Sequence, residues 1–127
     1  MKPYEIERFV RNKLEEMFGS RFRKAKLVVG YDRQKRPQIH EFDAVSEKMD
    51  IIGEIKSGKS TRKNFNSALV DCFYLNRVHA RTKLIVFTDE KLYEYFKSKS
   101  EGLIHNEILA ILIAPESSSK PMVSQLL

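Results

Sequence analysis

The chain has 127 residues, of which 42% are hydrophobic and 31% charged, and its formal net charge is +6. This length fits one domain with a core of its own, and the lack of any run of about 18 apolar residues excludes a transmembrane span. Cys72 is the single cysteine, which excludes an intrachain disulfide and a thiolate zinc cluster. Its apolar neighbours predict a buried small side chain.

The charged, amphipathic N-terminal segment does not resemble a signal peptide, so we expect an intracellular protein. The basic balance, 23 Lys and Arg against 17 Asp and Glu, favours polyanionic partners that bind through phosphate contacts.

Residues 3–18 are predicted to form a helix, because apolar residues recur at three- and four-residue spacing between Ile6 and Phe18. Pro3 suits its first turn and Gly19 its end. Residues 20–26 read as a basic connector.

Three strands are predicted next, and the short polar turns between them indicate an antiparallel meander. They cover residues 26–31, 38–45 and 50–57. Hydrophobic periodicity then predicts a helix over residues 61–78, with Ser60 or Thr61 as its N-cap.

The apolar run at residues 83–88 is typical of a strand buried on both faces. Because a helix separates it from the strand at 50–57, these two strands should be parallel neighbours. A helix at 90–98 and a strand at 108–114 complete an α/β domain over residues 1–114, with a mixed sheet flanked by helices. Residues 115–127 are expected to be a flexible tail, in which Met122, Val123, Leu126 and Leu127 could dock.

Charged residues stand out where the two central strands are otherwise apolar. Glu54 and Lys56 share one face of their strand, since alternate side chains point the same way. Asp43 lies between Phe42 and Ala44 on the preceding strand and falls opposite Glu54 or one residue from it. An ionised carboxylate in such surroundings needs a counter-charge or a metal.

Two converging carboxylates form a hard-oxygen site of the kind that Mg²⁺ occupies, with Mn²⁺ as a substitute. The backbone carbonyl of Ile55 is a further candidate ligand, and Glu41 shares the face of Asp43. Lys56 would then stand beside the metal, where it could help activate the attacking water or stabilise charge at phosphorus. An exposed cross-strand ion-pair network is the structural alternative for the three residues.

The pattern Asp43, ten residues, Glu54-Ile55-Lys56 resembles the signature of the PD-(D/E)XK nuclease superfamily, and the α-β-β-β-α-β order over residues 3–90 resembles its restriction-endonuclease-like core. The resemblance implies a divalent-metal phosphodiesterase acting on nucleic acid, usually DNA. Two departures are visible: Phe42 replaces the usual proline, and the helix at 61–78 lacks the Gln of some exonuclease branches.

Many members of that superfamily take a further acid from the first helix. Glu7, in Glu7-Arg8-Phe9-Val10, resembles the helix start of archaeal Holliday-junction resolvases and is the candidate here. Glu5 is the alternative, and a solvated helix acid is the structural alternative for both.

A phosphate-binding loop is matched literally by Gly53, Gly58, Lys59 and Ser60. We interpret this match as accidental, because the residues between the two glycines continue a strand pattern and Glu54 would repel phosphate. His40, His79 and His105 show no ligand spacing and are expected to be ordinary surface or core residues.

Basic side chains near the carboxylates are candidates for contacts to a nucleic-acid backbone. They are Lys59, Arg62 and Lys63 after the third strand, and Arg33, Lys35 and Arg36 in the first turn. The sequence thus predicts a Mg²⁺-dependent endonuclease of structure-selective or weakly sequence-specific action on DNA, with a homodimer as a plausible form. The alternative is a catalytically silent nucleic-acid-binding module, or an assembly subunit, on the same fold.

Overall fold

The computed structural model describes residues 1–100, 102, 107–115 and 122–125. Within these residues the chain forms three helices and one six-stranded sheet. The helices are α1 (Pro3–Phe18), α2 (Arg62–Leu75) and α3 (Glu90–Ser100). The strands are β1 (Phe22–Tyr31), β2 (Pro37–Ser46), β3 (Ile51–Lys56), β4 (Thr82–Phe87), β5 (Ile108–Leu112) and β6 (Met122–Gln125).

The strands lie in sequence order across the sheet, from β1 to β6. The β1–β2–β3 meander is antiparallel, β3, β4 and β5 are parallel, and β6 returns antiparallel to β5. The predicted α/β class with a mixed sheet is therefore confirmed, as is the parallel pairing of β3 and β4. No helix among the described residues has the length and apolar character needed to cross a membrane.

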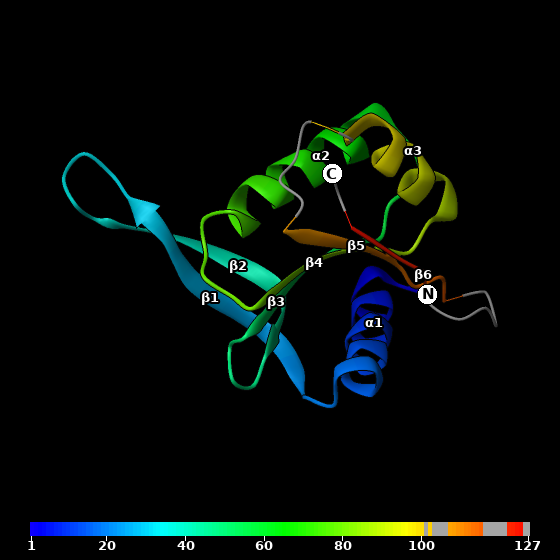
Figure 1. Cartoon of the computed structure of the whole chain (residues 1–127), viewed down its shortest axis with the longest axis horizontal. Helices are drawn as coiled ribbons and strands as arrows, with labels where there is room; N and C mark the ends of the chain where they lie inside the picture. The colour runs from blue at the N-terminus through cyan, green and yellow to red at the C-terminus, as the bar shows by residue number, and fades with distance from the viewer. Residues whose placement is uncertain (101, 103–106, 116–121, 126–127) are drawn as a thin grey trace.

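Helices cover both faces of the sheet, with α1 on one side and α2 and α3 on the other (Figure 1). Val10 and Leu14 of α1 pack with Ile51 and Ile55 of β3. The opposite face buries a larger cluster that includes Ile52, Phe87, Ala68, Cys72, Leu75, Leu92, Tyr93 and Phe96. Cys72 is 2% exposed, as its apolar neighbours predict, and burial raises the pKa of its thiol to about 12.

The helix ends follow local capping chemistry. Gly19, with φ of 70°, ends α1 in the left-handed region that favours glycine. The Thr61 hydroxyl accepts a hydrogen bond from the Asn64 N–H at 3.1 Å and so caps α2. Of the two caps that the sequence allows, Thr61 is the one used.

Two segments differ from their predicted structure. The expected basic connector forms the first half of β1, because Phe22 packs against one core cluster and Ala25 against the other while the backbone pairs with β2. In the expected flexible tail, residues 122–125 form β6, which completes the edge beyond β5. The rest of that segment, residues 116–121 and 126–127, lies outside the described residues, and so does His105.

The middle of β2 contains a β-bulge. Arg23 is opposite Val45 and Ala25 opposite Phe42, so β2 takes three steps where β1 takes two. The extra residue falls at Asp43 and Ala44. The ladder between β2 and β3 consists of Ala44 with Gly53 and Val45 with Ile52. From Asp43 back to Pro37, β2 is thus released from β3, and this release shapes the candidate site.

The largest core side chains give a direct test of the packing. Phe87 is fully buried and its ring contacts those of Tyr93 and Phe96. We expect Phe87→Ala to lower the free energy of unfolding by about 3–5 kcal/mol in urea titrations, since it removes buried surface and leaves a cavity. Val70→Ala, at a residue 52% exposed on α2, is the control and should change it by less than about 0.5 kcal/mol. Equal effects of the two substitutions would contradict the packing described.

Candidate active site

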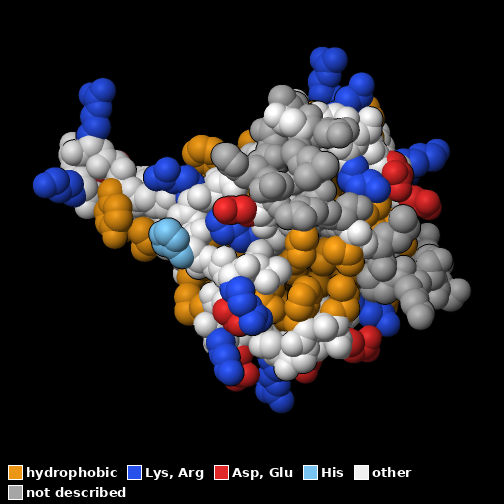
Figure 2. All heavy atoms as spheres, in the orientation of Figure 1, with side chains coloured by type: hydrophobic (Ala, Val, Ile, Leu, Met, Phe, Trp, Pro, Cys, Tyr) orange, Lys and Arg blue, Asp and Glu red, His pale blue; other side chains and the backbone are white. Residues whose placement is uncertain are grey.

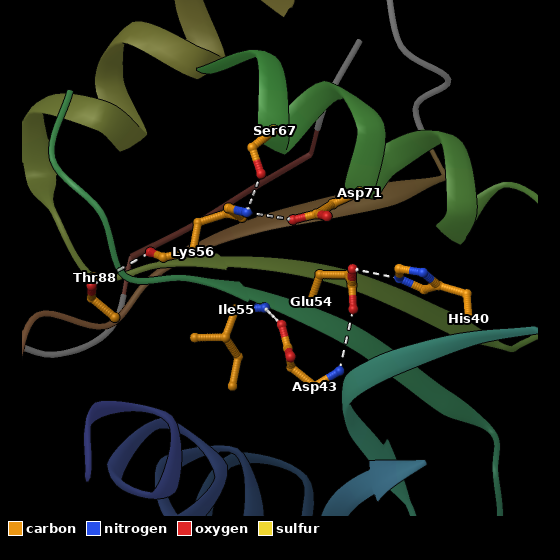
Figure 3. Close-up of polar contacts among 8 residues, drawn as sticks. All are labelled: His40, Asp43, Glu54, Ile55, Lys56, Ser67, Asp71 and Thr88. Carbon is orange, nitrogen blue, oxygen red and sulfur yellow. Dashed lines mark hydrogen bonds and ion pairs between the residues drawn. The ribbon is translucent and has the colours of Figure 1, made fainter. Parts of the chain in front are cut away.

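Asp43 and β3 are joined by two hydrogen bonds that replace the missing ladder. The Ile55 N–H donates to Asp43 Oδ2 at 2.9 Å, and the Asp43 N–H donates to Glu54 Oε1 at 3.2 Å (Figure 3). The bulge turns the Asp43 carboxylate toward β3, which is a known use of bulges next to functional sites. The two carboxylates that the sequence placed opposite one another are therefore brought together.

Glu54 is buried, with 3% of its surface exposed. Its second carboxyl oxygen, Oε2, lies 3.0 Å from Nε2 of His40, and the His40 ring stacks on Tyr74 with centroids 3.9 Å apart. Both oxygens of Glu54 thus have partners, one from the backbone of β2 and one from a side chain of the same strand.

Glu7 approaches Asp43 from α1, and its carboxylate raises the pKa of Asp43. Lys24 Nζ lies 3.3 Å and Arg11 Nη1 4.0 Å from Glu7 Oε1. That oxygen is buried, and neither cation is aligned to give it a hydrogen bond. Glu5, the alternative acid, is exposed and accepts a bond from the Lys2 N–H. The acid of α1 that faces the site is therefore Glu7.

Burial and neighbouring carboxylates raise the pKa values of this site. Burial, together with the nearby Asp71 and Asp43 carboxylates, raises the pKa of Glu54 from 4.5 to about 9. Burial also raises the pKa of Asp43, against the lowering effect of the Ile55 N–H. Burial is the larger cause in both cases, and repulsion from neighbouring carboxylates adds to it.

Lys56 points from β3 toward α2 (Figure 3). Its Nζ lies 2.6 Å from the Ser67 hydroxyl and 3.0 Å from Oδ2 of Asp71. The side chains of Lys56 and Asp71 are 17% and 13% exposed, so this ion pair is shielded from water. The backbone carbonyl of Lys56 accepts a hydrogen bond from the Thr88 N–H at 3.1 Å. The lysine is held in place by α2 and the end of β4 together.

Sequence reasoning did not single out Asp71 or His40 as neighbours of the carboxylates. Ser67 and Asp71 are one helical turn apart and border the apolar stripe of α2, which is the signal that could have indicated polar residues facing the sheet. His40 was expected to be an ordinary histidine, but it contacts Glu54. Strand alternation offered no sign of this, because the bulge changes which way β2 side chains point. His79 is exposed, as expected.

The Ile55 carbonyl faces the same gap as the Ile55 N–H, because both groups of one strand residue point to the same neighbouring strand. That gap is the one opened by the bulge at Asp43. Glu41, by contrast, is exposed and opposite Lys26, so it stands apart from the two carboxylates.

The candidate nucleic-acid contacts fall into two groups. Lys59, Arg62 and Lys63 are exposed at the start of α2, just after Lys56, whereas Arg33, Lys35 and Arg36 are exposed at the tip of the β1–β2 hairpin. The two groups lie apart, because β1 and β2 extend away from the other strands (Figure 1). Glu54 to Lys56 lie within β3, which agrees with the reading of the phosphate-loop match as accidental.

A cavity of about 410 Å³ lies beyond the carboxyl ends of β3 and β4, and Ser57, Gly58, Lys59 and Thr88 are among its lining residues. It begins one residue after Lys56 but is not lined by Asp43 or Glu54. Crevices outside the carboxyl ends of parallel strands are common ligand positions, so this hollow adjoins the candidate site without containing it.

The donor set suits magnesium. Among the described residues no three His, Cys, Asp or Glu side chains are grouped so as to hold a metal ion by themselves. Mg²⁺, however, is usually bound by one or two carboxylates, with water and phosphate oxygens completing its shell. Asp43 and Glu54 are the two carboxylates of this site that could serve in this way.

Comparison with known proteins gives no matching family model, no similar curated protein and no similar solved structure. The chemistry of the site thus rests on its own residues.

The raised pKa of Glu54 predicts a pH-dependent stability. An acid whose pKa is higher in the folded state binds its proton more tightly there, so the free energy of unfolding should fall as pH rises from about 5 toward 9. We expect Glu54→Gln to flatten the slope of unfolding free energy against pH, by an amount that corresponds to at most one bound proton. The measurement is a series of urea titrations without divalent cations between about pH 5.5 and 8.5. Glu16→Gln, at an exposed carboxylate, is the control and should retain the slope. A slope unchanged by Glu54→Gln would contradict the raised pKa.

The Lys56–Asp71 pair can be measured by a double-mutant cycle. We expect Lys56→Met to lower the free energy of unfolding by about 3 kcal/mol, because it leaves Asp71 shielded from water without its cation. Together with Asp71→Asn, the cycle should give a coupling energy of about 1–3 kcal/mol. The control is the exposed Lys13–Glu16 pair, with Nζ 3.5 Å from Oε2, and Lys13→Met with Glu16→Gln should give a coupling below about 0.5 kcal/mol. A coupling no larger than the control would show that Asp71 does not hold Lys56.

Proposed function

We propose that this protein is a divalent-metal-dependent nuclease that hydrolyses phosphodiester bonds of DNA, on a restriction-endonuclease-like core. The observation that carries the proposal is the convergence of Asp43 and Glu54 at the bulge, where burial and the neighbouring carboxylates raise both pKa values. Lys56, two residues after Glu54 on the same strand, adds the third member of the pattern.

Asp43 and Glu54 would hold Mg²⁺ or Mn²⁺, with the Ile55 carbonyl and Glu7 as further donors. A bound Mg²⁺ would polarise a phosphodiester and make water at the site more acidic. To hold the metal, Glu54 would have to give up its bond from His40 or from the Asp43 N–H, and the cation would then balance its charge.

Lys56 supplies the positive charge that phosphoryl transfer requires. Asp71 and Ser67 restrict its Nζ to one position in the absence of substrate. An incoming phosphate competes with Asp71 for this ammonium group. Lys56 then stabilises charge at phosphorus or orients the attacking water, while Ser67 keeps hold of it.

DNA as the substrate class is supported by the charge of the surface. Lys59, Arg62 and Lys63 lie at the start of α2. A second basic region begins at the other end of the same helix, where Tyr74 contacts the β1–β2 hairpin. Glu54 and Lys56 lie on β3, which packs against α2 between these two basic regions. A duplex that contacts both basic regions would therefore pass close to the site.

A second candidate function is DNA binding without cleavage. The observation that favours it is the 3% exposure of Glu54, with hydrogen bonds to both of its oxygens. A carboxylate that never leaves this arrangement would serve as a structural anchor for β2.

The test is cleavage of supercoiled plasmid, single-stranded DNA and four-way junctions in Mg²⁺ and Mn²⁺. We expect cleavage that chelation abolishes, and that Asp43→Asn and Glu54→Gln reduce to background. Lys56→Met should lower the rate by about 10²–10⁴-fold, as loss of a group that assists proton transfer or charge stabilisation does. The rates are to be measured at a temperature where circular dichroism shows each variant folded.

Glu16→Gln should cut as the wild type does and controls for loss of one carboxylate. Full activity in Glu54→Gln would rule out the assigned site. Tight DNA binding by the wild type with no cutting in either metal would establish the second candidate instead. Sedimentation of the protein alone and on DNA tests whether a homodimer performs the two cuts of a duplex.

A further inference from the structure

The positive charge of this chain is concentrated in one segment. Residues 21–41 contain seven Lys and Arg and two Asp and Glu, so they carry +5 of the chain's formal +6. One of the two acids, Asp32, is engaged within the turn, where it accepts bonds from the Gln34 and Arg36 N–H groups and pairs with the Arg36 guanidinium at 2.8 Å. Figure 2 shows Lys and Arg side chains at the tip of this segment.

This segment is a two-stranded arm that leaves the sheet. We call residues 27–39 the hairpin arm. Here β2 pairs with β1 alone, because its ladder with β3 stops at Ala44. Figure 1 shows the arm projecting from the body of the molecule. A ribbon of two strands spaced about 4.8 Å apart fits the major groove of B-DNA, which is about 12 Å wide.

The direction of the arm is set by contacts with α2 and the residues after it. Arg77 Nε donates to the Val29 carbonyl at 3.0 Å. Gly30 makes room for this arginine, because a Cβ there would lie 3.0 Å from its guanidinium nitrogen. Next to the arm, His40 stacks on Tyr74. The arm is therefore braced at its base, beside the candidate active site.

One face of the arm is apolar and exposed. Val28 and Ile39 are paired across β1 and β2, and 46% and 60% of their surfaces are exposed. Their neighbours Leu27 and Val29 point the other way and pack into the core that α2 covers. Val28 and Ile39 thus form an apolar patch on the face away from α2, with the basic turn beyond it.

We propose that the hairpin arm docks in the major groove of duplex DNA, with Arg33 and Lys35 against the phosphates and Val28 and Ile39 toward the base edges. This inference rests on the proposed function for the choice of DNA. Charge complementarity favours a polyanion over a second copy of the chain, since two arms of like charge repel each other. Arg36 stays with Asp32 and keeps the turn folded.

The arm is tested by the binding of a fluorescent duplex, measured by anisotropy in EDTA so that no cleavage occurs. We expect Arg33→Gln with Lys35→Gln to weaken binding about tenfold or more, and to reduce the slope of log K against log salt by about 0.9 for each phosphate that is no longer neutralised. The matched control, Lys91→Gln with Lys99→Gln, removes two exposed cations of α3 and should change neither quantity. Both variants keep the Asp32–Arg36 pair and hence the turn.

The groove is tested with modified duplexes. Methylation of guanine N7, a major-groove atom, should weaken wild-type binding, whereas methylation of adenine N3, a minor-groove atom, should not. Val28→Ser with Ile39→Ser should reduce the effect of N7 methylation, because these side chains no longer approach the base edges.

Equal binding by the Arg33→Gln, Lys35→Gln variant and its control would overturn the proposal, even if the wild type cleaves DNA. Sensitivity to N3 methylation alone would overturn the assignment to the major groove. Sedimentation could instead show that the wild type is a dimer. If Val28→Ser with Ile39→Ser dissociates that dimer and leaves DNA binding unchanged, the apolar patch binds a second copy of the chain and not DNA. Arm-dependent binding without any cleavage would leave this inference standing while the proposed nuclease activity fails.

Discussion

The exchange of hydrogen bonds between Asp43 and β3 is the interaction on which the rest of the molecule depends. A regular ladder would continue past Ala44 and pair β2 with β3 through backbone atoms. Instead, a side-chain carboxylate of β2 accepts the Ile55 N–H, and a side-chain carboxylate of β3 accepts the Asp43 N–H. Both buried N–H groups are satisfied, and two acidic groups are held at the junction. The same break frees the rest of β2 to form an arm.

This junction has a cost in stability that the surrounding structure offsets. Glu54 is retained in the interior although burial and two neighbouring carboxylates oppose its ionisation. Large apolar clusters on both faces of the sheet, from Val10 and Leu14 on one side to Phe87 and Phe96 on the other, supply the compensating stability. Destabilising groups supported by a well-packed scaffold are common at functional sites.

Most of the fold could be predicted from the sequence, because it follows from local periodicity and chain connectivity. The helix at Pro3–Phe18, the three-stranded meander and the parallel β3–β4 pair each have a pattern that a few consecutive residues carry. β6 could not, since four residues in a polar segment become a strand only when the edge of β5 is there to pair with. The first half of β1, residues 22–26, could not be predicted either. Its basic side chains suggest a connector, and only the folded structure shows that Phe22 packs against one core cluster and Ala25 against the other.

The sequence by itself determined that Asp43, Glu54 and Lys56 stand near one another, because short turns and strand alternation fix register over a few residues. Only the tertiary structure decided what surrounds them. Asp71 and Glu7 come from helices on opposite faces of the sheet, and contacts between elements distant in sequence leave no local pattern. His40 joined Glu54 because a bulge changed the direction of its strand. A single extra residue of this kind changes which face the side chains before it share with those after it, without changing the composition that predicts a strand.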